Sequence, residues 1–178
     1  GIGARHITIS TVGIVPKIIE FADLCAAEGL EIQLAISLHA TEDAARSATM
    51  PVNRRYSIAE LIDACRYYVK QSGRRVTFEW ALIAGVNDSV DEAQKLAHLL
   101  RGIRAHVNVI PLNPTRGFRG TPSSASQAFV DELGRCGVPA TVRVRRGIDI
   151  DAGCGQLAAA VSKREREEER ARVAAARV

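Results

Sequence analysis

Residues 32–40 have the sequence IQLAISLHA, which is apolar at most positions and carries a serine and a histidine near its end. A strand with one solvent-facing side alternates apolar and polar residues, whereas a strand covered on both faces is almost continuously apolar. The segment therefore predicts a strand inside a parallel sheet. Its polar residues, Ser37 and His39, then lie near the carboxyl end of that strand, where α/β sheets bind their ligands.

Four other segments have the composition of β-strands. They are rich in β-branched residues and are bounded by turn signals; they cover residues 6–11, 75–83, 107–114 and 140–145. Apolar residues at helical spacing lie between them, over residues 16–29, 57–72, 87–101 and 124–136. A strand-to-strand interval of about 30 residues is typical of right-handed βαβ units. The predicted fold class is therefore α/β with a parallel sheet.

Two of the predicted helices have recognisable starts. Ser57 is followed three residues later by Glu60, the spacing of a capping box, in which each residue binds the other's backbone N–H. Asn87 and Asp88 are expected to turn the chain and to cap the next helix. These signals set the expected helix boundaries.

Three of the four cysteines lie on apolar faces of the predicted helices. Cys25, Cys65 and Cys136 are spaced with apolar neighbours at helical intervals, so we expect them in the core. The cysteines are too widely and irregularly spaced for a zinc site or a small disulfide framework. No metal site is therefore predicted in this chain.

Polar residues stand at the carboxyl ends of four successive predicted strands: Ser10, Thr11, Ser37, His39, Glu79 and Asn113. Parallel strands bring such residues to one edge of the sheet, which favours a binding site there. Simpler explanations stay open for each of them. Serine and threonine often cap turns, an interior histidine is usually a satisfied core residue, Glu79 can face solvent, and Asn113 precedes a proline as in many turns.

Cys154 differs from the other cysteines because it lies between two glycines, just before an alanine-rich segment with helical propensity. A thiol at a helix start ionises readily, since the helix dipole and nearby cations such as Arg145 and Arg146 stabilise the thiolate. Flanking glycines leave space for a reactant. The alternative is that Cys154 is a small buried hydrophobic residue.

The composition is that of a globular protein, with 47% hydrophobic and 25% charged residues in 178. No apolar run is long enough for a membrane span and no signal peptide is recognisable, so we expect a cytoplasmic protein without membrane contact. The net charge of +4 comes with several arginine pairs, which suit phosphate binding but are equally explained by compositional bias. We expect one domain over residues 1–160 and a charged helical tail over 161–178.

Five segments in order resemble the dual-specificity radical S-adenosylmethionine (SAM) RNA methyltransferases that act on C2 of adenine. They are ISTVGIVP (9–16), LAISLHA (34–40), PVNRRY (51–56), NVIPLNP (108–114) and DIDAGCGQL (149–157). The resemblance covers residues 5 to about 160. It implies a partial (βα) barrel, of which this chain is the later half, from about the third strand.

The resemblance also implies the site. It assigns the SAM pocket to Ser10, Ser37, Leu38, His39 and Asn113, and it makes Cys154 the residue that carries the methyl group before its transfer to RNA. In the family a [4Fe-4S] cluster, reduced by a flavodoxin-type donor, splits a second SAM, and Cys154 ends in a disulfide. The RNA is ribosomal, transfer or both, and C8 of adenine is the alternative target atom.

This sequence departs from the family in lacking the CxxxCxxC cluster motif, since no two of its cysteines are closer than 18 positions. Together with Met50 as the only methionine, this predicts a carboxyl-terminal part of a longer enzyme that is inactive alone. Two alternatives remain open. One is a non-catalytic RNA-binding module, and the other is an unrelated α/β enzyme with His39 and Glu79 as acid and base.

Overall fold

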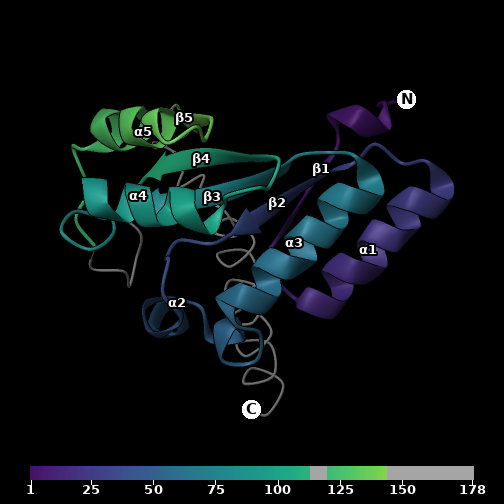
Figure 1. Ribbon diagram of the computed structural model, residues 1–178, viewed down its shortest axis with the longest axis horizontal. Coiled ribbons are helices and arrows are strands. Elements are labelled where there is room, and N and C mark those ends of the chain that lie inside the picture. Colours follow the sequence, from purple (N-terminus) through teal and green to yellow (C-terminus); the bar gives the residue numbers. More distant parts are fainter. Residues whose placement is uncertain (113–119, 144–178) are drawn as a thin grey trace, which may run out of the picture. The chain divides into compact units, whose positions relative to one another are not determined.

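The computed structural model describes residues 1–112 and 120–143, which contain a single five-stranded sheet (Figure 1). Its strands are β1 (Thr8–Thr11), β2 (Gln33–Ser37), β3 (Val76–Leu82), β4 (Ala105–Pro111) and β5 (Ala140–Val142). All neighbouring strands are parallel, and their order in the sheet is their order in the chain. The predicted α/β class is confirmed. Asn113, Cys154 and the predicted tail 161–178 lie outside the described residues.

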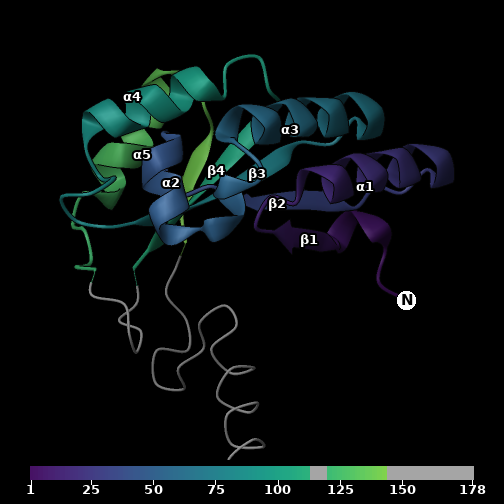
Figure 2. The same ribbon diagram turned by 90° about the horizontal axis from the view of Figure 1, so that it is seen from below.

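Four helices make the crossovers between the strands: α1 (Val15–Glu28), α3 (Ile58–Ser72), α4 (Val90–Leu99) and α5 (Ser126–Arg135). Figure 2 shows α1, α3 and α4 along one side of the sheet. The pairs α1 with α3 and α4 with α5 pack side by side. Sequentially ordered parallel strands with helices on one face are the layout of part of a (βα) barrel, as predicted.

Three short elements complete the described chain: η1 (Ala4–His6), α2 (Asp43–Thr49) and η2 (Pro51–Arg54). The last two lie in the connection between β2 and α3, which the sequence pattern left without regular structure. In the described residues, no helix combines the length and apolar character needed to cross a membrane.

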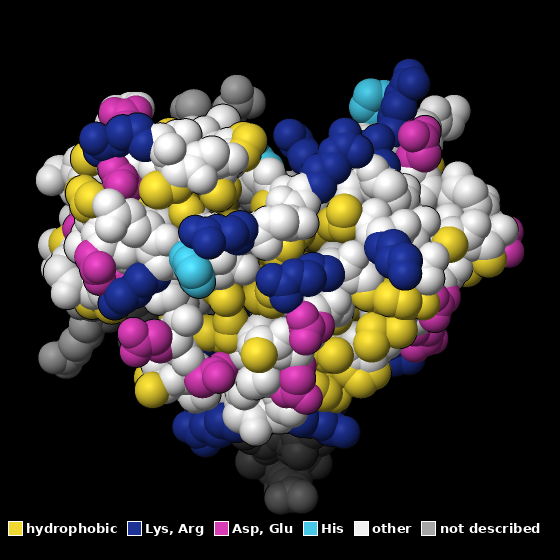
Figure 3. Space-filling model, in the orientation of Figure 1, with side chains coloured by type: hydrophobic (Ala, Val, Ile, Leu, Met, Phe, Trp, Pro, Cys, Tyr) yellow, Lys and Arg dark blue, Asp and Glu magenta, His cyan; other side chains and the backbone are white. Residues whose placement is uncertain are grey.

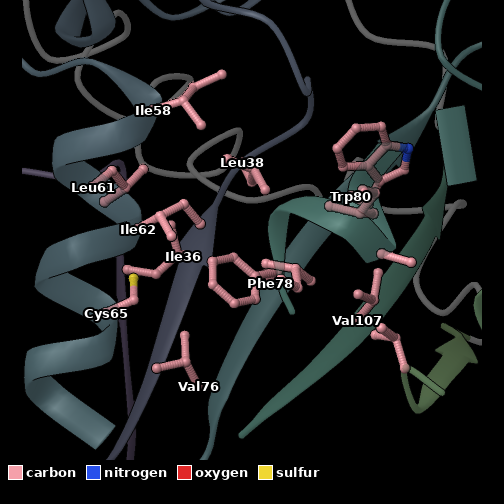
Figure 4. Packing of buried hydrophobic residues seen from close by; sticks show 14 of the residues in the cluster. Ile36, Leu38, Ile58, Leu61, Ile62, Cys65, Val76, Phe78, Trp80 and Val107 are labelled. Atoms are coloured by element: carbon pink, nitrogen blue, oxygen red, sulfur yellow. The ribbon is translucent and has the colours of Figure 1, made fainter. Parts of the chain in front are cut away.

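The core lies between the sheet and its helices. Along β3 the residues Val76, Phe78, Trp80 and Leu82 are fully buried, and the residues between them are only partly buried. Figure 4 shows Phe78 facing Ile62 and Cys65 of α3. The alternation means that one face of β3 packs on the helices while Thr77, Glu79 and Ala81 lie on the other face.

The helix boundaries confirm some expectations and correct others. The capping box at Ser57 is present, with Glu60 in its expected role. The cap of α4 is Ser89, whose side chain accepts from the N–H of Glu92, so the prediction that Asn87 and Asp88 cap this helix was wrong. The side chain of Asn87 instead points inward and is 4% exposed.

The cysteine predictions were right for two residues and wrong for one. Cys25 and Cys65 are buried, as expected, and burial raises the pKa of Cys65 to about 12. Cys136 is exposed. The reason is that α5 ends at Arg135, so Cys136 follows the last turn and no longer lies on the apolar face of the helix.

Candidate functional site

Polar residues form a row across the face of the sheet opposite the helices. In the strand register Ser37 lies beside Glu79, Glu79 beside Asn108, and Asn108 beside Thr141. Asn108 Nδ2 donates to Glu79 Oε2 at 2.8 Å. Burial raises the pKa of Glu79, and this hydrogen bond opposes the rise. Glu79 is therefore a half-buried, hydrogen-bonded carboxyl group and not simply a solvent-facing side chain.

Ser10 lies on the same face of the sheet but on the edge strand. It pairs in register with Ala35, two positions before Ser37, and its side chain is exposed. Ser37, at the end of β2, is half-buried, and Leu38 is fully buried with its N–H donating to the carbonyl of Glu79 at 3.2 Å. Leu38 therefore faces the core with its side chain and takes part at the strand end only through its backbone.

His39 has an unusual backbone conformation directly after β2. Its φ of 61° is the one left-handed value of a non-glycine residue among those described. The ring Nδ1 accepts the backbone N–H of Ala81 at 3.0 Å. Burial, together with the smaller effect of the nearby cation of Arg46, lowers the pKa of His39 to about 4. At neutral pH the ring is uncharged, and its one proton is on Nε2, which makes that atom a hydrogen-bond donor.

A cavity of about 490 Å³ lies at the carboxyl ends of β2, β3 and β4. His39, Ala81 and Leu112 line it from the strand ends, and Met50, Ile83 and Val86 add apolar walls. Its polar lining includes Thr41, whose hydroxyl donates to Glu92 at 2.9 Å. Concave, mostly apolar walls with a few polar groups are typical of sites for small molecules.

A second cavity, of about 500 Å³, lies at the opposite end of the strands. It is bounded by the ends of α4 and α5, including Cys136, and by residues at the starts of β4 and β5, including Ala105 and Pro139. None of the residues predicted from the sequence to form the site lines it. We therefore take the cavity beside His39 as the candidate functional site.

Of the described residues predicted to form the site, His39 lines this cavity. Ser37 and Leu38 directly precede His39 and Ser10 lies on the adjacent strand, but none of these three is a lining residue. Asn113 directly follows Leu112, a cavity residue, but it lies outside the described residues, as does Cys154. Within the described ranges 1–112 and 120–143, no group of three or more His, Cys, Asp or Glu residues is arranged to hold a metal ion. Two residues buried beside the turn at His39 were not predicted from the sequence: Asn87, which lines the cavity, and Arg46.

No family model matches the chain. Individual proteins of known name do match it. The dual-specificity RNA methyltransferase RlmN 1 of Myxococcus xanthus is 55% identical over 166 residues, 92% of this chain. A probable dual-specificity RNA methyltransferase RlmN of Bacillus licheniformis is 53% identical over 170 residues, 94% of this chain. The chain is a relative of the RlmN-type RNA methyltransferases. It spans 45% of the length of each of these two proteins, corresponding to their carboxyl-terminal half.

Solved structures agree with this assignment. The crystal structure of a radical SAM methyltransferase from Sphaerobacter thermophilus is 54% identical, with a TM-score of 0.80 over 86% of this chain and 45% of that one. A domain of a pyruvate-formate lyase-activating enzyme from Bacteroides vulgatus matches with a TM-score of 0.53 at 14% identity, over 78% of this chain and 98% of that domain. The second match supports the fold alone.

Proposed function

We propose that this chain is the carboxyl-terminal part of a radical SAM enzyme that methylates C2 of an adenine in ribosomal RNA, transfer RNA or both. The observation that carries the proposal is the identity of 53–55% over more than nine-tenths of the chain to proteins named as dual-specificity RNA methyltransferases. A flavodoxin-type protein is the proposed electron donor and the cytoplasm the proposed location. Figure 3 shows cationic side chains at several places on one face, interspersed with acidic ones, so charge alone supplies little support for RNA binding.

SAM is the proposed ligand of the strand-end cavity, which His39 lines, and of the strand ends beside it, with Ser10, Ser37, Leu38 and Asn113 as the further proposed binding residues. The amino-acid end of SAM carries an ammonium and a carboxylate, and its adenosine end carries ring nitrogens and hydroxyls. Hydroxyls, backbone groups and the Nε2 donor of neutral His39 match these acceptors and donors. The apolar residues Met50, Ile83 and Leu112 in the same cavity suit the adenine ring.

Cys154 is the proposed methyl carrier. Its thiolate displaces the methyl group from the sulfonium of SAM, which forms S-methylcysteine and releases S-adenosylhomocysteine. The described cysteines do not suit this role or that of cluster ligands. Cys25 and Cys65 are buried on different helices, and burial raises the pKa of each. Cys136 is exposed but lies at the opposite end of the strands from the candidate site. The described cysteines therefore do not fit a [4Fe-4S] cluster, and we propose that the cluster is bound by the amino-terminal half of the full-length enzyme.

The test replaces Cys154 by alanine in the full-length protein and measures methyladenine in RNA by mass spectrometry. We expect methylation to fall below detection, because no other sulfur takes over the methyl group. Cys136→Ala is the matched control, since Cys136 is exposed and lies at the opposite end of the strands; it should retain wild-type activity. Unchanged methylation by Cys154→Ala would favour a non-catalytic RNA-binding module instead.

A further inference from the structure

Three consecutive backbone carbonyls at the end of β2 accept hydrogen bonds from two buried side chains. Arg46 Nη2 donates to the carbonyl of Ser37 at 2.8 Å, and Arg46 Nε donates to that of Leu38 at 3.1 Å. Asn87 Nδ2 donates to the carbonyl of His39 at 2.9 Å. The turn 37–39 is thus held from two sides, by α2 and by the loop after β3.

The same guanidinium also binds the neighbouring strand end. Arg46 Nη2 donates to the carbonyl of Val12, directly after β1, at 2.7 Å. The next residue, Gly13, has a φ of +100°, and a Cβ there would lie 3.3 Å from Arg46 Nη2 and 3.1 Å from Leu61. Glycine therefore leaves the space that lets Arg46 reach both strands. One side chain fixes the distance between the strand ends that carry Ser10 and Ser37.

Arg46 is itself held by a second layer of buried polar groups. Its Nη1 donates to Asn53 Oδ1 at 2.9 Å. Asn53 Nδ2 donates in turn to Asp43 Oδ1 at 2.9 Å and to Ser47 Oγ at 3.0 Å. Asp43 Oδ1 also accepts the N–H of Ile58 at the start of α3. The position of the guanidinium is therefore determined by α2, η2 and α3 together.

The arrangement is costly for stability alone. Arg46 is 0% exposed, yet within the described ranges it forms no direct ion pair with a carboxylate; its partners are three carbonyls and one amide oxygen, and the charge of Asp43 acts on it from behind Asn53. Taking a cation out of water without a carboxylate partner is unfavourable, and apolar residues fill such space at lower cost. The left-handed backbone of His39 adds strain that persists only where the surroundings hold it. Both features indicate that the geometry of the turn serves a purpose other than stability.

We propose that Arg46 and Asn87 are positioning residues for SAM binding, which hold turn 37–39 and the end of β1 in the arrangement that receives the ligand. The inference rests on the proposed SAM site. Asn87 connects the turn to β3, because its Nδ2 also donates to the carbonyl of Ala81 and its Oδ1 accepts the N–H of Ile83. Arg46 does not line the cavity, so its role is indirect; Asn87 lines it, so the effect of an Asn87 variant on SAM affinity is read together with the hydrogen exchange of the turn.

The experiment uses Arg46→Lys and Asn87→Asp in the full-length protein. Lysine keeps the positive charge but cannot reach four acceptors in different directions. Aspartate keeps the shape and the acceptor of Asn87 but loses the Nδ2 donor to the carbonyls of His39 and Ala81 and adds a negative charge. Leu133→Ala is the control, because Leu133 is fully buried on α5, away from the turn. Removing this side chain destabilises the fold but leaves the hydrogen bonds of the turn in place. We measure the SAM dissociation constant, hydrogen exchange of peptides covering residues 37–41, and the midpoint of thermal unfolding.

We expect both turn variants to exchange faster over residues 37–41 and to bind SAM at least about tenfold more weakly. Leu133→Ala should lower the unfolding midpoint while it leaves the SAM dissociation constant within about twofold of wild type. Unchanged exchange in the two turn variants overturns the inference. So does faster exchange with unchanged SAM affinity.

The outcomes also separate this inference from the proposed function. A wild-type protein that does not bind SAM overturns the proposed ligand, and faster exchange in the turn variants then still shows that the side chains hold the turn. If Arg46→Lys does not fold, Asn87→Asp carries the same comparison, because it leaves the four hydrogen bonds of Arg46 in place.

Discussion

The helix-facing side of β3 and the turn after β2 are both buried, but they consist of opposite kinds of side chain. Phe78 lies in a cluster of apolar side chains, whereas the carbonyls of the turn at residues 37–39 accept hydrogen bonds from Arg46 and Asn87. Apolar packing tolerates many residues of similar volume, because its energy depends little on direction. Hydrogen bonds to three particular carbonyls do not tolerate such exchange, because each requires a donor at a defined position and direction. Apolar packing in the core thus stabilises the fold, and this stabilisation offsets the cost of holding the turn in one geometry.

The largest effect is expected from breaking the apolar region. Phe78→Ala removes a fully buried ring between β3 and α3, which should lower the free energy of unfolding by about 3 to 5 kcal/mol. Urea unfolding of the full-length protein measures this change. The fraction that stays folded should bind SAM with wild-type affinity, since Phe78 lies on the helix side of the sheet. A large loss of affinity in folded Phe78→Ala would show that core and turn are not independent.

The pH dependence of stability tests the turn by a different route. Because burial and Arg46 lower the pKa of His39 from 6.5 to about 4, the unfolded chain takes up this proton at a higher pH than the folded one. Neutral His39 makes its full contribution to the free energy of unfolding above pH 6.5. This contribution is lost as the pH falls from 6.5 towards 4, by at most roughly 3 kcal/mol.

The measurement compares urea unfolding of wild type and His39→Gln at pH 7.5 and pH 4.5. Glutamine has no ionisable group, so the difference in unfolding free energy between the two pH values should be smaller in the variant. Carboxylate titrations affect both proteins alike and cancel in the comparison. Equal pH dependence of the two proteins would mean that His39 becomes charged in the folded state without cost.

The apolar region was predictable from the sequence because its signal is periodic. The alternation along β3 and the helical spacing of Leu61, Ile62 and Cys65 are local properties of the chain, and the structure confirms both. Ser37 and His39 were also expected at a strand end, since the strand pattern stops beside them. Cys136 was misjudged because an apolar face does not reveal where its helix ends.

The polar region was not predictable in the same way. Arg46 lies in a segment without an apolar period, and its burial depends on carbonyls 8, 9 and 34 positions away in the chain. Asn87 resembled a helix cap because asparagine is common there, but Ser89 caps α4 by accepting the N–H of Glu92, and Asn87 binds the turn instead. Backbone acceptors carry no sequence signal, so a side chain that serves them is recognised only once the fold is known. Gly13 is the one local hint, since a glycine after a strand often marks close approach.

The smallest effect is expected at Trp80, where the two regions meet. Its ring stacks on Phe129 with centroids 5.8 Å apart, and its indole Nε1 donates to the carbonyl of Asn87 at 3.2 Å. Trp80→Phe keeps an aromatic ring in the core but removes this donor, so we expect a loss of about 1 to 2 kcal/mol in unfolding free energy.

Trp80→Phe also decides how the turn is held. If the side chain of Asn87 is fixed mainly by its bonds to Ala81 and Ile83, the variant should exchange over residues 37–41 as wild type does and bind SAM with equal affinity. If its affinity falls as far as that of Asn87→Asp, the indole is part of the structure that positions the turn. Trp80 would then be a core residue that also positions the turn, as Arg46 does.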